Sequence, residues 1–132
     1  MTKNQEVEVE YHKNGNKKHE RHIKDGELDG VSTSWFEDGT LLCLYHYRNG
    51  KPDGVFNGWY KNGNKQYEMR WKDGHPCGVS TWHWFYEDGT KEKEKLIKND
   101  KDFYWFCSKL EKLTIQQFFD GDRHLLGLGS FN

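Results

Sequence analysis

The fold of this chain is decided by one 24-residue stretch, Val31–Gly54, which reads VSTSWFEDGTLLCLYHYRNGKPDG. Two runs rich in aromatic and β-branched residues flank Asp38-Gly39, and a second turn sequence around Asn49-Gly50 follows the second run. Asp-Gly and Asn-Gly between such runs are the strongest short-range signals for a β-hairpin. The stretch therefore predicts two antiparallel strands joined by a tight turn.

The same pattern recurs on both sides of this stretch. A block at about residues 7–30 precedes it, and blocks at about 55–78 and 79–102 follow it. The first turn glycines of the four blocks are spaced by 24, 24 and 26 residues: Gly15, Gly39, Gly63 and Gly89. Repeats of this length are typical of architectures in which each unit stacks on its neighbours. We therefore expect an all-β protein, residues 1–132 forming one domain, built as a single-sheet antiparallel meander of about four hairpin repeats.

Composition and charge restrict the class of protein. The 132 residues carry 20 Lys and Arg against 21 Asp and Glu, so the net charge is −1. A nucleic-acid-binding domain would show a clearly basic surface, so we expect no nucleic-acid partner. No run of about 18 apolar residues is present, and the N-terminus lacks the apolar region of a signal peptide. Because the three cysteines form no disulfide pattern, we expect a cytoplasmic protein.

Hydrophobic spacing predicts the register of each hairpin. Counted from the turn glycine, even offsets hold most of the aromatic residues, as at Tyr45 and Tyr47. A three-residue loop that ends in a left-handed glycine pairs even offsets with even offsets, whereas a two-residue loop does not. We therefore predict bulged loops with positive φ at the four turn glycines. The predicted core face then includes the residues four positions before each glycine: Tyr11, Trp35, Trp59 and Phe85.

The motif Val-x-x-x-Trp-Phe/Tyr-x-Asp/Asn-Gly, followed by an aromatic residue and Asp/Asn-Gly-x-x-x-Gly, resembles the MORN repeat. Over about residues 7–100 the chain is similar to the variant in bacterial YwqK-type proteins, which are often described as antitoxin components of toxin–antitoxin systems. The resemblance implies a non-catalytic module for protein–protein recognition, with a cognate toxin as a candidate partner. It also implies, as an alternative, a peripheral module that binds anionic membrane lipid, which the net charge disfavours.

Catalytic residues, metal ligands and cofactors are not expected. His19 and His22 are an odd number of residues apart, so on one strand their side chains would lie on opposite faces. His75 and Cys77 could supply two ligands from a turn, but zinc sites use three or four. No Gly-x-Ser-x-Gly motif occurs, and Cys107 has no evident partner base. We therefore expect no enzyme activity.

The C-terminal segment, residues 103–132, departs from the repeat and is expected to cap the array. Two interpretations are open. In the first, the segment is a degenerate hairpin repeat, because Leu110 and Gly121 keep the eleven-residue spacing of the two turns. In the second, Ser108 to Glu111 is a capping box that begins a short helix, which ends at Gly121.

One surface is a candidate binding site. On the face opposite the predicted core, repeat 1 is polar, whereas repeats 3 and 4 carry large aromatic residues at odd offsets. An apolar cluster on a polar face indicates a contact surface, and Trp and Tyr are enriched at interface hot spots. The candidate binding residues are Phe56, Tyr60, Trp82, Trp84 and Tyr86. Either the apolar C-terminal segment covers this patch, or the patch binds a protein partner or a second copy of the chain.

Overall fold

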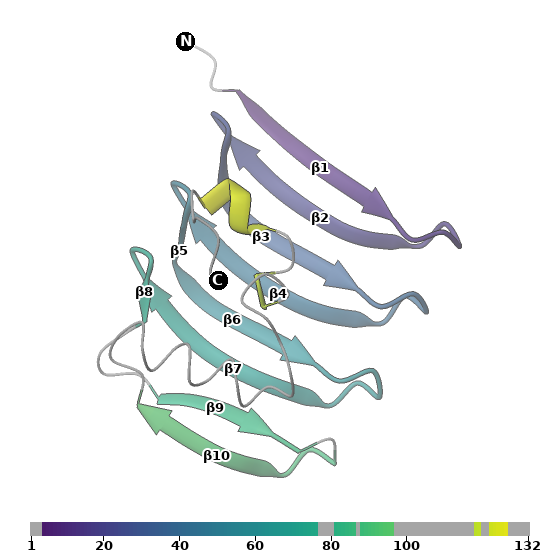
Figure 1. Cartoon of the computed structure of the whole chain (residues 1–132), viewed down its shortest axis with the longest axis vertical. Helices are drawn as coiled ribbons and strands as arrows, with labels where there is room; N and C mark the ends of the chain where they lie inside the picture. The colour runs from purple at the N-terminus through teal and green to yellow at the C-terminus, as the bar shows by residue number, and fades with distance from the viewer. Residues whose placement is uncertain (1–3, 77–80, 87, 97–117, 120–121, 127–132) are drawn as a thin grey trace.

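The computed structural model describes residues 4–76, 81–86, 88–96, 118–119 and 122–126 (Figure 1). The strands form one antiparallel sheet in the order β1-β2-β3-β4-β6-β7-β9-β10, and the short strands β5 and β8 pair with β4 and β7. The elements are β1 Gln5–Tyr11, β2 Lys17–Lys24, β3 Glu27–Trp35, β4 Leu41–Arg48, β5 Lys51–Pro52, β6 Gly54–Trp59, β7 Lys65–Lys72, β8 His75–Pro76, β9 Thr81–Phe85, β10 Lys91–Leu96 and the 3₁₀ turn η1 Asp122–Leu126. The expected all-β meander is confirmed. No helix in these ranges is long and apolar enough to cross a membrane.

Tight two-residue turns connect one repeat to the next. After β2, Lys24 pairs directly with Glu27, and the two residues between them, Asp25 and Gly26, have φ of 52° and 80°. Positive φ at both central residues defines a type I′ turn, whose twist matches that of the strands it joins. The turns after β4 and β7 repeat this arrangement. Consecutive strands therefore stay adjacent throughout the sheet.

The predicted bulged loops are confirmed within each repeat. Gly39 has φ of 90°, and its N–H donates to the Phe36 carbonyl at 3.0 Å. The Phe36 N–H in turn donates to the Thr40 carbonyl at 2.8 Å, which closes a three-residue loop. The other turn glycines have φ of 93° or 94°: Gly15, Gly63 and Gly89. Glycine reaches this left-handed conformation without the steric cost of a Cβ atom.

The acidic residue before the turn glycine also stabilises the loop. The Thr40 hydroxyl and backbone N–H donate to Asp38 Oδ1 at 2.6 and 2.9 Å, and Thr90 makes the same two bonds to Asp88. Because these bonds favour the ionised carboxylate, they lower the pKa of Asp38 and of Asp88. These hydrogen bonds within the loops thus explain why Asp38 and Asp88 occupy the position before the turn glycine.

The predicted core face is wrong on the first strand of each hairpin, because each hairpin contains a second bulge beyond the loop. In the β3/β4 hairpin, Trp35 pairs with Leu41, but the preceding residue Ser34 pairs with Cys43, so Leu42 is an extra residue. The other three hairpins shift register at the equivalent position. One extra residue reverses which side chains share a face. Beyond this bulge, first-strand residues at odd offsets from the turn glycine lie on the same face as second-strand residues at even offsets.

The core lies on the face of the sheet that Phe118, Phe119 and η1 cover, which we call the tail-covered face (Figure 1). The ring centroid of Phe118 lies 5.5 Å from that of Tyr45 and 5.5 Å from that of Tyr67. The second-strand aromatic residues are buried, as predicted, whereas the first strands contribute Phe56 rather than Trp59. The buried hydrophobic residues are Ile23, Leu28, Cys43, Tyr45, Tyr47, Phe56, Tyr67, Met69, Trp71, Phe118 and Phe119.

The aromatic ladder assigned to the core is instead on the opposite face. Tyr11 is 60% exposed, and Trp35 and Trp59 are only partly buried. Each of these three residues directly follows a residue of the tail-covered face; Trp35, for example, follows the buried Ser34. Because successive strand residues point to opposite faces, the three side chains lie on the other face. The side chain of Phe85 lies outside the described residues.

The C-terminal segment covers one face of the sheet where the structure describes it. Phe118 and Phe119 pack on the core aromatic residues, and η1 contacts β3. The two interpretations that began at Leu110 and at Ser108 fall outside the described residues.

Candidate functional site

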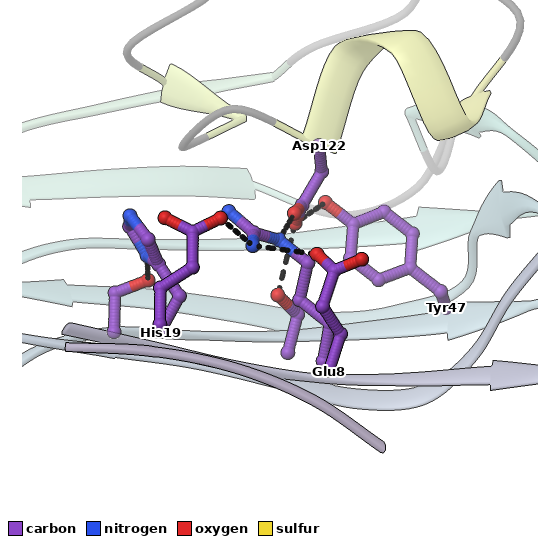
Figure 2. A network of polar contacts seen from close by, with 8 residues as sticks. Glu8, His19, Tyr47 and Asp122 are labelled. Atoms are coloured by element: carbon purple, nitrogen blue, oxygen red, sulfur yellow. Dashed lines mark hydrogen bonds and ion pairs between the residues drawn. The ribbon is translucent and has the colours of Figure 1, made fainter. Parts of the chain in front are cut away.

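A buried ion pair attaches the C-terminal segment to the first two repeats (Figure 2). Asp122 in η1 is fully buried, and its Oδ1 accepts a hydrogen bond from Nε of Arg21 in β2, which is 3% exposed. The hydroxyls of Ser32 and Tyr47 donate to Asp122 Oδ2 at 2.9 and 3.1 Å. Donors from β2, β3 and β4 thus satisfy one carboxylate, which fixes the position of η1 over these strands.

Glu8 and Glu10 of β1 contact the same guanidinium (Figure 2). The Oε1 atom of each lies 3.2 Å from Arg21 Nη1, and their side chains are 44% and 51% exposed. Among the residues that the structure describes, three carboxylates therefore surround one guanidinium. The excess negative charge lies on the solvent-exposed side, along β1.

Hydroxyl groups hold the segment at Phe118. The Tyr45 hydroxyl contacts the Tyr67 hydroxyl and donates to the Phe118 carbonyl. The ring of Phe56 stacks on Tyr45 with the centroids 4.1 Å apart. Burial, with a smaller contribution from Tyr67, raises the pKa of Tyr45 well above its ordinary value. The Tyr45 phenol therefore remains protonated and able to donate.

The histidines of the first repeat lie where their spacing predicts. His19 is buried on the tail-covered face, where its Nδ1 lies 2.8 Å from Ser34 Oγ, whereas the side chain of His22 is 46% exposed. Across the described ranges, no three His, Cys, Asp or Glu side chains are grouped so that they could hold a metal ion.

The structure describes the side chains of three residues of the predicted binding patch: Phe56, Tyr60 and Tyr86. Phe56 is fully buried against Phe118 and Phe119, so its placement on the outer face was wrong, and the second bulge is the reason. Phe118 and Phe119 of the C-terminal segment thus cover Phe56, but the choice between the two explanations depends on Trp82 and Trp84. Tyr60 and Tyr86 occupy equivalent turn positions, where each pairs with the residue after the turn glycine.

The other residues of the predicted patch differ in how far the structure describes them. Tyr86 is 53% exposed and Tyr60 is partly buried. The side chains of Trp82 and Trp84 lie outside the described residues, although the backbone of Trp84 pairs with that of Tyr67. Exposure therefore supports Tyr86, rather than Phe56, as a surface residue.

Sequence reasoning missed a second candidate surface, the row of side chains on the face opposite the core. Backbone pairing aligns each aromatic residue with a partner across its hairpin, and the rows of neighbouring repeats adjoin. We call this set the outer row: Tyr11, Lys17, Trp35, Leu41, Trp59 and Lys65. Lys17 Nζ lies 5.8 Å from the centroid of the Trp35 ring, within cation–π range. The outer row is thus a continuous strip of aromatic and aliphatic surface.

The lysines of the outer row are neutralised by their neighbours. Lys17 Nζ lies 2.7 Å from Glu20 Oε1, and Lys65 Nζ lies 2.7 Å from Glu68 Oε2. The hydrogen bond to Glu20 also raises the pKa of Lys17. The outer row therefore presents aromatic surface without excess positive charge.

Comparison with known proteins supports the class of protein that the repeated hairpins indicate. Residues 28–49 and 52–73 each match the MORN repeat variant. Both matches begin next to a tight turn between repeats and run through one complete bulged loop, and together they cover about one third of the chain. These matches support a MORN repeat protein. No curated protein and no solved structure matches the chain.

Proposed function

We propose that this chain is a non-catalytic MORN-type module that recognises a protein partner through the outer row. The observation that carries the proposal is the accessible aromatic strip, with Tyr11 60% exposed at its end. Aromatic side chains supply most of the binding energy in many protein interfaces. On the tail-covered face, the aromatic residues whose side chains the structure describes are buried in the core with Phe118 and Phe119. The MORN repeat matches are compatible with a module for protein or membrane binding.

Charge favours a protein partner over the rival, an anionic lipid surface. Peripheral lipid binding relies on clusters of basic residues, each contributing about 1 kcal/mol near the membrane. Here the net charge is −1, and both outer-row lysines form ion pairs with glutamates at 2.7 Å. A module of this kind lacks the positive field that anionic headgroups require.

For the identity of the partner, we propose a cognate toxin in a bacterial cytoplasm. The support is the resemblance of the repeats to those of YwqK-type proteins. The first protein to test is therefore the product of the gene adjacent to the one that encodes this chain.

Tyr11→Ala is expected to weaken binding of that product at least about tenfold, which corresponds to about 1.4 kcal/mol. The melting temperature should change little, because the side chain is 60% exposed. Titration calorimetry and thermal unfolding of the same samples measure both quantities. Val7→Ala is the matched control, because Val7 is 56% exposed on the same strand but outside the outer row. Equal affinities for Tyr11→Ala and the unmodified chain would contradict the role of the outer row.

A lipid-binding control separates the two functions. Cosedimentation with phosphatidylserine vesicles is expected to show no binding at low salt. Binding that falls as the salt concentration rises would support the lipid-binding alternative instead.

A further inference from the structure

The sheet has an exposed edge at β1. β1 is the first strand in the sheet order and pairs with β2. All its residues except Val9 are exposed, including Val7 at 56%. An edge strand presents backbone N–H and C=O groups that a further strand can pair with. β1 is therefore a surface onto which another strand can be added.

The charges on β1 determine which strand would fit. Glu8 and Glu10 face the tail-covered side, where together with Asp122 they surround the single guanidinium of Arg21. Two copies of β1 paired with each other would bring these carboxylates together, and like charges directly opposite one another destabilise a strand pair. A strand with basic residues at alternate positions would instead match the excess negative charge.

The backbone pairing between neighbouring repeats, which we call the repeat lattice, specifies the register of the added strand. Where two repeats meet, Cys43 pairs with Gly58, so the residue four after one turn glycine faces the residue five before the next. The β7/β9 pair keeps the same offsets. The residue five before the first turn glycine is Glu10, and the residue four after the last turn glycine is Lys93. Continuing the lattice would therefore place Lys93 opposite Glu10.

We propose that a second copy of this chain adds its β10 to the β1 edge. β10, with the sequence KEKEKL, is the last strand in the described sheet order. The lattice register pairs Lys93 of one copy with Glu10 of the next, and Lys95 with Glu8. Opposite charges directly across two strands are favourable. The contact is head-to-tail, so it builds open rows of copies rather than closed dimers.

A charge exchange tests this interface with the full chain. In low salt, sedimentation velocity of the unmodified protein should show a mean mass that rises with protein concentration. The E8K/E10K variant alone and the K93E/K95E variant alone should each remain monomeric, because their two edges then carry the same charge. An equimolar mixture of the two variants should associate again, because each edge finds an opposite one.

Matched controls keep the result interpretable. K13E/K18E makes the same change in net charge as K93E/K95E but at exposed positions away from both edges, and should associate like the unmodified chain. E8Q/E10Q avoids placing a cation beside Arg21, and should associate at least about tenfold more weakly. Thermal unfolding verifies that each variant is folded.

Three outcomes would overturn the proposal. The unmodified chain could remain monomeric at every concentration in low salt. Association could persist in K93E/K95E, which would indicate a different interface. The mixture of charge-exchanged variants could fail to associate although both are folded. None of these results depends on the outer row, so the proposed function is tested separately.

Discussion

Arg21→Met is expected to lower the free energy of unfolding by about 3–5 kcal/mol, the usual cost of removing one member of a buried ion pair. The substitution leaves the Asp122 carboxylate fully buried without the Arg21 cation, while the Ser32 and Tyr47 hydroxyls still donate to it. Glu8 and Glu10 lose their shared cation but stay about half exposed and hydrated. Urea unfolding followed by tryptophan fluorescence measures the loss.

A double variant distinguishes the ion pair from simple packing. In R21M/D122L both buried charges are replaced by apolar groups, so its stability should lie closer to that of the unmodified chain than the stability of either single variant does. Additive losses in the double variant would show that Arg21 and Asp122 do not act as a pair. A loss below about 1 kcal/mol in R21M would show that Asp122 is not buried as the structure has it.

Gly58→Val is expected to destabilise the fold by about 3 kcal/mol, at the upper end of the usual cost of overpacking. A Cβ atom at Gly58 would overlap the ring of Tyr67, which is itself packed against Tyr45 and Phe118. Movement of the ring away from the new side chain would disturb these two contacts. Urea unfolding of the variant measures the cost.

The cause can be checked by removing the ring that obstructs the new side chain. In G58V/Y67A the two losses should be clearly less than additive, because the valine then occupies space that the tyrosine has left. Gly15→Ala is a useful reference, since a Cβ there meets no atom within 4 Å and only the positive φ is penalised. Additive losses in G58V/Y67A would contradict the packing explanation.

The repeat lattice and the bulged loops could be predicted from sequence because glycine marks them directly. Positive φ at Gly39 requires a residue without Cβ strain, so the 24-residue spacing of such glycines defines the turns. The second bulge carries no such mark. Its extra residue, Leu42 in repeat 2, is an ordinary strand residue, and the equivalent positions hold Lys18 and Gln66. A bulge of this kind accepts many residue types, so the assignment of faces was reversed on the first strands.

The attachment of the C-terminal segment to the sheet could not be predicted from local sequence patterns either. Arg21 and Asp122 are 101 residues apart, and no spacing rule connects them. One signal was present: Arg21 occupies the repeat position at which Tyr45 and Met69 are buried. A charged residue at a core position indicates a buried partner, although it does not say which carboxylate supplies it. Gly58, outside the glycine lattice, was a similar signal for close packing.

We expect the outer row to bind a protein partner while Phe118 and Phe119 of the C-terminal segment stay on the opposite face. Hydroxyl-radical labelling, read by mass spectrometry with and without the adjacent gene product, tests both parts. We expect Tyr11, Trp35 and Trp59 to be labelled in the free chain and protected in the complex, and Phe56 to remain unlabelled in both. Unchanged labelling of the outer row together with new labelling of Phe118 would contradict the claim, because the partner would then have displaced the segment and bound the other face.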